Sequence, residues 1–135
     1  NAKIYATDIA NDALDIARAA VFHNNSMLNV SDILRERYFF SSNGRYKVRY
    51  DIRDSVRFGS LNIVKHPPIS KIDILFCRNL LIYFEKGLQM TVLRKLDYAQ
   101  SPGGILVLGK AEALPAPLSQ HYSEIEKGSR IYIKD

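Results

Sequence analysis

The sequence predicts an α/β fold, in which strands and helices alternate as in a doubly wound sheet and the chain finishes with antiparallel strands. A β-prone run, Ile4–Thr7, leads through an acidic residue into a helical pattern, which is half of a β-α-β unit. Two later apolar runs, Ile72–Phe76 and Ile105–Leu108, have the composition of buried strands and flank a second helical pattern. At 135 residues the chain is one domain at most.

Two helices are expected in the first part of the chain. The first is capped by Asn11, and its apolar positions are Ala13, Leu14, Ala17, Ala20 and Val21. The second is short and runs from a cap at Ser31 to Arg37.

The composition changes between Arg37 and Ser60, where aromatic and β-branched residues surround the turn signal Ser41–Gly44. Tyr46, Val48 and Tyr50 alternate with basic residues, which is the period of a half-buried strand, and Ser55–Phe58 is a further strand candidate. We interpret residues 37–58 as a small antiparallel hairpin inserted in the α/β pattern. The alternative, an irregular connection, is disfavoured by the length of the segment.

The second half follows a linker at His66–Pro68 and begins with the strand Ile72–Phe76. A helix is expected from Glu85 to Ala99, with Leu88, Val92, Leu96 and Ala99 on one face. Gly103-Gly104 precedes the strand Ile105–Leu108, and two more strands are expected around Tyr122–Ile125 and Arg130–Lys134.

Composition limits the class of protein. No apolar run approaches the roughly 20 residues that span a bilayer, so no membrane insertion is expected. A single cysteine fits a reducing, cytoplasmic location. The net charge of +5 comes from scattered bases, which favours a solvated face over nucleic-acid binding; attraction of an acidic peptide or ligand is the milder alternative. The three histidines are not at metal-ligand spacing, so no metal is assigned.

The segment Asp73–Phe84 is the strongest site candidate. It reads as a buried strand that ends in the polar tip Cys77-Arg78-Asn79 and then enters a second apolar run. In open α/β sheets, ligands bind outside the carboxyl ends of the strands, where such a tip lies. Cys77 itself is interpreted as a small apolar filler rather than a nucleophile.

Four blocks of the sequence carry a recognisable pattern: Ile4–Ile9, Val56–Ile63, Asp73–Phe84 with its "FCRN…IYF" pattern, and Pro102–Gly109 followed by Glu112. Together they resemble the catalytic domain of the CheR-type chemotaxis receptor methyltransferases. The resemblance implies a Rossmann-like class I methyltransferase sheet, present from the family's second strand onward. The core is then 1–36 and 59–135, with 37–58 inserted; in some family members this insert docks a receptor peptide by strand addition.

The resemblance also implies an activity: transfer of a methyl group from S-adenosylmethionine to glutamates of a receptor or related signalling protein, leaving S-adenosylhomocysteine. Asp8 is then expected to hydrogen-bond the ribose hydroxyls of the cofactor, and the alternative is an acid that stabilises a helix N-terminus. Asn62 and the backbone of Ile63 are expected beside the adenine, and the alternative for Asn62 is an ordinary turn residue.

Arg78 and Asn79 are expected at the amino-acid end of the cofactor, where arginine can hold a carboxylate in a bidentate pair. The alternative for Arg78 is a salt bridge across the strand tip. Tyr83 is expected near the transferred methyl, as the catalytic residue that orients the incoming carboxylate. Its alternative is a packed aromatic with a satisfied hydroxyl.

Some family features are missing from these residues. The family's glycine-rich first loop and its N-terminal helical domain have no counterpart here, and Ala10 and Gly109–Glu112 depart from its pattern. We therefore expect the fragment to be inactive alone. A second hypothesis is a non-catalytic, degenerate methyltransferase fold that serves as an interaction module in a multidomain signalling protein. An open sheet edge would also favour a homodimer.

Overall fold

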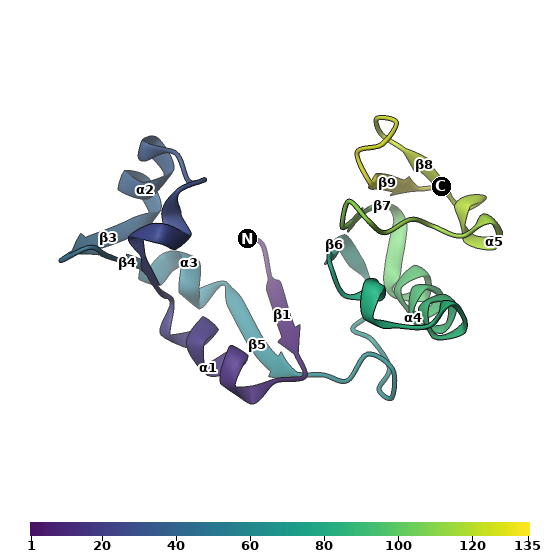
Figure 1. Cartoon of the computed structure of the whole chain (residues 1–135), viewed down its shortest axis with the longest axis horizontal. Coiled ribbons are helices and arrows are strands. Elements are labelled where there is room, and N and C mark those ends of the chain that lie inside the picture. The colour runs from purple at the N-terminus through teal and green to yellow at the C-terminus, as the bar shows by residue number, and fades with distance from the viewer. The chain divides into compact units, whose positions relative to one another are not determined.

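The computed structural model describes residues 1–135 and divides the chain into two compact units, Asn1–Asn62 and Ile63–Asp135 (Figure 1). The predicted α/β class is confirmed, with both parallel and antiparallel strand pairs. Hydrogen bonds join the strands into three separate sheets, of two, three and four strands. A single doubly wound sheet therefore stays a prediction.

The first unit begins with strand β1 (Ile4–Asp8), which pairs in parallel with β5 (Val56–Ser60) and places Asp8 opposite Ser60. Helix α1 (Asn11–Ala19) follows β1 and buries Leu14. Two expectations are corrected here. The N-cap position is Ala10 rather than Asn11, and the helix ends before Val21 because Ala20 adopts a left-handed backbone with φ 54°.

Val21 instead opens β2 (Val21–His23), a strand that the sequence reading missed. It belongs to an antiparallel sheet in the order β2-β4-β3, with β3 spanning Phe39–Ser42 and β4 spanning Arg45–Val48. A hairpin is confirmed within the predicted segment 37–58, over β3 and β4, and its turn uses positive φ at Asn43 and Gly44. Between β2 and β3 lie the 3₁₀ turn η1 (Asn24–Met27) and α2 (Asp32–Tyr38).

The cap at Ser31 is also confirmed, because its Oγ accepts a hydrogen bond from the Leu34 amide at 3.3 Å. Tyr50 was wrongly placed in a strand. It starts α3 (Tyr50–Asp54), for which Arg49 is the N-cap residue. The strand that follows, β5, pairs with β1 and not with the hairpin.

The second unit holds the four-stranded sheet in the order β6-β7-β9-β8 (Figure 1). Strands β6 (Ile72–Cys77) and β7 (Gln100–Leu108) are parallel, whereas β9 (Ile131–Lys134) and β8 (Tyr122–Glu124) run antiparallel, so the antiparallel finish is confirmed. The helical segments are η2 (Leu81–Tyr83), α4 (Lys86–Ala99) and α5 (Ala116–Ser119).

The core of the second unit lies on one face of this sheet. Its most deeply buried side chains are Leu81, Val92, Leu93, Leu106 and Leu108, from η2, α4 and β7. Strand β6 was expected to be a buried strand, and this holds for one of its faces only. Leu75 and Cys77 face the core, but Ile74 is 55% exposed and Phe76 is 72% exposed, because successive side chains of a strand point to opposite faces.

Candidate functional site

Asp8 and Asn62 lie at the carboxyl edge of the two-stranded sheet in the first unit. Asp8 is the last residue of β1, and Asn62 follows β5 by two residues. The Leu61 amide donates to the Asp8 carbonyl at 3.0 Å, which ties the segment after β5 to the end of β1. The parallel pairing thus brings these two predicted residues to one edge.

The Asp8 side chain also lies at the start of α1. Its Oδ1 accepts a hydrogen bond from the amide of Ala10, the N-cap residue, at 2.9 Å. The alternative helix-terminus role is therefore partly realised. The carboxylate remains exposed, so its other oxygen is open to a hydroxyl donor from a ligand.

Ile63 lies in the second unit, where it packs against the hydrophobic core. The loop that starts at Ile63 is held by Lys95 of α4. The Lys95 ammonium donates to the carbonyls of Ile63 at 3.1 Å, Val64 at 2.6 Å and His66 at 3.3 Å. An ammonium group has three N–H donors, so these three carbonyls use its full capacity.

Arg78 and Asn79 directly follow β6 and are both exposed. Arg78 forms no ion pair, so the alternative of a salt bridge across the tip finds no support. Asn79 has φ 59°, in the left-handed region that few residues other than glycine adopt. The backbone therefore kinks at Asn79, and the Arg78 guanidinium is exposed without an ion-pair partner.

The tip is anchored by Glu112, a residue to which the sequence reading gave no role. Glu112 is 4% exposed, and its carboxylate accepts hydrogen bonds from four backbone amides. Oε1 accepts from Asn79 and Gly109, both at 2.8 Å, while Oε2 accepts from Leu80 at 3.1 Å and Leu81 at 2.6 Å. The tip after β6 and the end of β7 are joined through this one carboxylate.

Tyr83 ends η2 and is 78% exposed, so the alternative of a packed aromatic is wrong. Cys77, by contrast, is part of the core, as its interpretation as an apolar filler requires. Burial, and secondarily the charge of Glu112, raise the pKa of the Cys77 thiol to about 11, so the thiol stays protonated near neutral pH.

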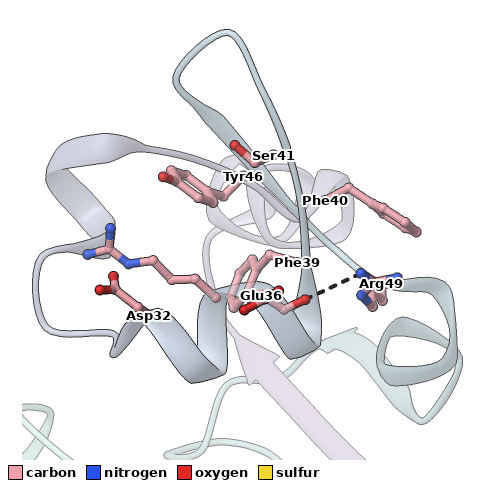
Figure 2. Close-up of a pocket in the computed structure, with 8 residues that line it drawn as sticks. Asp32, Glu36, Phe39, Phe40, Ser41, Tyr46 and Arg49 are labelled. Carbon is pink, nitrogen blue, oxygen red and sulfur yellow. Dashed lines mark hydrogen bonds between the residues drawn. The ribbon is translucent and has the colours of Figure 1, made fainter.

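A cavity of the first unit contains none of the predicted residues. It has a volume of about 440 Å³ and lies against α2 and the β3–β4 hairpin (Figure 2). Its polar walls carry both signs of charge, from Asp32, Glu36, Arg35 and Arg49. Arg49 lies 4.4 Å from the centre of the Phe40 ring and donates to the Glu36 carbonyl at 3.3 Å.

The six predicted residues therefore fall into two sets. Asp8 and Asn62 share an edge of the first unit, whereas Ile63, Arg78, Asn79 and Tyr83 belong to the second. Sequence reasoning missed Lys95 and Glu112, which hold the backbone beside Ile63 and Asn79. The only available signal for Glu112 was its place at the end of the last matched block. No group of three or more histidine, cysteine or acidic side chains has a metal-binding arrangement.

Comparison with known proteins gives a family match along almost the whole chain. The model described as "CheR methyltransferase, SAM binding domain" matches residues 1–131. A domain of that description binds S-adenosylmethionine as the methyl donor, so the predicted resemblance and the predicted cofactor are both confirmed. No helix is long and apolar enough to cross a bilayer.

Three relatives illustrate the range of proteins that contain a similar sequence. Chemotaxis protein methyltransferase 1 of Vibrio cholerae is 37% identical over 82% of the chain and 42% of its own length. Chemotaxis protein methyltransferase 1 of Pseudomonas aeruginosa is 35% identical over 92% of the chain and 46% of its length. An uncharacterised 104.1 kDa protein of Rhodobacter capsulatus is 34% identical over 96% of the chain and 14% of its length. The chain thus spans less than half the length of each.

Proposed function

This chain belongs to the CheR methyltransferase family through its SAM-binding domain, and we propose that it is part of a protein-glutamate O-methyltransferase. The acceptors would be glutamate side chains of chemoreceptors or related signalling proteins, and the product of the donor would be S-adenosylhomocysteine. The observation that carries the proposal is the family match over residues 1–131. A cytoplasmic location and a Rossmann-like arrangement of the sheet belong to the same proposal.

The exposed groups fit a cofactor that joins adenosine to an amino acid. One oxygen of the Asp8 carboxylate accepts from the Ala10 amide, but the group as a whole is exposed. The other oxygen is therefore available to accept from the ribose hydroxyls. Arg78 has an exposed guanidinium without an ion pair, which suits a carboxylate. Asn62 and Ile63 would lie beside the adenine.

Methyl transfer to a carboxylate needs little acid–base catalysis from the protein. S-adenosylmethionine supplies an electrophilic methyl group on a sulfonium. A glutamate side chain has a pKa of about 4.3 and is already an anion at neutral pH, so no general base is needed. The protein's contribution is to hold the carboxylate in line with the methyl group. Tyr83, whose phenol is exposed at the end of η2, would orient that carboxylate.

The chain alone would not suffice for turnover. It spans 42% and 46% of the two chemotaxis methyltransferases, so more than half of such an enzyme lies outside it. We therefore propose that residues 1–135 bind the cofactor weakly and do not methylate on their own.

Calorimetric titration with S-adenosylhomocysteine tests the proposal on the full-length protein and on residues 1–135. We expect clear binding by the full-length protein, and a loss of roughly tenfold or more in affinity for Asp8→Asn, which removes a charge-assisted hydrogen bond. Asp12→Asn, at an exposed acid in the first turn of α1, is the matched control. A full-length protein that binds no cofactor would instead favour the non-catalytic interaction module.

A further inference from the structure

One buried carboxylate, that of Glu112, holds the backbone at the strand tip after β6. Glu112 is enclosed, with 4% of its surface exposed, and no lysine or arginine is paired with it. Its partners are the amides of Asn79, Leu80, Leu81 and Gly109, at 2.6 to 3.1 Å. A buried charge is tolerated when it is well hydrogen-bonded, and charge-assisted bonds to amides are among the stronger ones.

Three consecutive amides of this set, those of residues 79–81, lie where the tip leads into η2. They can point at one acceptor because the chain kinks at Asn79, where φ is 59°. A non-glycine residue in this region persists when the surrounding structure holds it there. Three of the four hydrogen bonds to Glu112 hold Asn79 in this conformation. They also fix the backbone that leads from Arg78 into η2.

The end of β7 is built to admit the carboxylate. A Cβ atom at Gly109 would lie 2.7 Å from Glu112 Oε1, 2.4 Å from Asn79 Oδ1 and 2.9 Å from the Asn79 amide nitrogen. All three distances are shorter than real Cβ contacts allow, so glycine is required for this close approach. Gly109 and Glu112 thus act together on the tip.

We propose that Glu112 is a positioning residue for the cofactor, which sets the amino-acid end of the S-adenosylmethionine site by holding the backbone of residues 79–81. This inference rests on the function proposed above, in which Arg78 and Asn79 receive that end of the cofactor. Glu112 is buried beneath the tip and acts through the amides that it holds. Its loss should therefore change cofactor binding and leave the transfer step at saturating cofactor almost unchanged.

The test compares full-length wild type with Glu112→Gln, in which an amide NH₂ replaces one acceptor oxygen and faces backbone donors. We expect the Kd for S-adenosylhomocysteine and the KM for S-adenosylmethionine to rise about tenfold, with kcat changed less than about threefold. Hydrogen exchange should accelerate at the amides of residues 79, 80, 81 and 109. Glu126→Gln, at an exposed glutamate of the same unit, is the control. It should change neither the Kd and KM for the cofactor nor the hydrogen exchange of these amides.

Each outcome decides a separate point. A wild type that binds no cofactor removes the proposed function and this inference with it. Faster exchange at the four amides with unchanged Kd and KM overturns the positioning role alone. A fall in kcat with KM unchanged indicates loss of folded enzyme and also overturns it. If Glu112→Gln does not fold, Glu112→Asp keeps the charge on a shorter chain and should show an intermediate KM; if neither folds, the role is structural and the inference is wrong.

Discussion

The side chains around the end of β6 do two different kinds of work. Arg78 and Tyr83 are exposed, so their polar groups are available to a ligand. Glu112 and Lys95 hold backbone instead, the first through four amides and the second through three carbonyls. Substitutions in the first pair should therefore alter chemistry at constant stability, whereas substitutions in the second pair should move the loops.

Tyr83→Phe isolates the proposed role of the phenol. Because the ring is 78% exposed, removal of the hydroxyl should leave the thermal midpoint unchanged. If the phenol orients the acceptor carboxylate, loss of one hydrogen bond should lower kcat for methyl transfer by roughly ten- to a hundredfold, with cofactor Kd unchanged. Radioactive methyl transfer to a receptor fragment measures the rate, and calorimetry measures Kd.

Tyr98→Phe is the matched control for this substitution. Tyr98 is 84% exposed on α4, and its hydroxyl has no role in the proposed site. Equal activities of Tyr83→Phe and wild type would remove Tyr83 from the catalytic step. A change in Kd without a change in kcat would move its role from the acceptor to the cofactor.

At the scale of elements, the final strands of the second unit are attached to α4 by a polar cluster around Asp97. The Tyr122 hydroxyl donates to Asp97 Oδ1 at 3.0 Å, His121 Nδ1 lies 3.3 Å from Oδ2, and the Lys134 ammonium lies 3.2 Å from Oδ1. Tyr122 lies in β8 and Lys134 in β9, so one helical carboxylate holds both strands of the closing hairpin.

This cluster makes the free energy of unfolding depend on pH. Burial acts to raise the pKa of Asp97, but the hydrogen bonds from Lys134, Tyr122 and His121 and the charge of Lys134 together lower it below its ordinary value. A folded-state pKa below the unfolded one adds stability above the unfolded pKa of about 3.9, and that stability is lost as pH falls through the folded pKa. The contribution should therefore be complete at pH 6 and decrease as pH falls below about 4 and through the lowered pKa of Asp97.

Urea unfolding of Asp97→Asn against wild type measures the effect. We expect a difference in free energy of unfolding of about 1–3 kcal/mol at pH 6 that shrinks below about pH 4. Asp15→Asn, which breaks the exposed pair of Asp15 with Arg18, should change little at any pH. A difference for Asp97→Asn that is constant from pH 6 to pH 3 would contradict the assignment.

Elements whose pattern agreed with their local geometry could be predicted from the sequence. The strand at Ile72, the helix through Val92 and the hairpin around Gly44 are examples. Val21 was placed on the apolar face of the first helix because it continues the helical spacing. No residue type in the sequence indicates that Ala20 adopts a left-handed backbone and ends the helix. Likewise, Tyr50 continues the period of β4, although the strand ends at Val48.

The sequence suggested the exposed candidate residues, whose role stays a prediction, and it missed the side chains that hold backbone. Asp8 ends β1, Arg78 follows β6 and Tyr83 ends η2, and all three are exposed. Glu112 and Lys95 escaped because their partners are backbone groups up to 33 and 32 residues away. A backbone amide looks the same at every position, so no pattern of residue types encodes such a contact.

At the scale of the whole molecule, each unit has open strand edges. In the second unit β6 is an edge strand, and its outward side chains Ile74 and Phe76 are 55% and 72% exposed. In the first unit β1 and β5 have only each other as partners. Exposed edges with apolar side chains favour pairing with another chain, so a homodimer of residues 1–135 stays a prediction.

Light scattering over a range of protein concentrations tests this self-association. We expect the mass of residues 1–135 to rise above 15.4 kDa with concentration. Phe76→Lys should restore the monomer, because a lysine on an edge strand opposes pairing with a second strand. Tyr98→Lys, which places the same charge at an exposed aromatic of α4, should leave association unchanged, since α4 presents no open backbone edge. A monomer at every concentration would remove the homodimer, and equal effects of the two lysines would indicate that net charge, not the β6 edge, controls association.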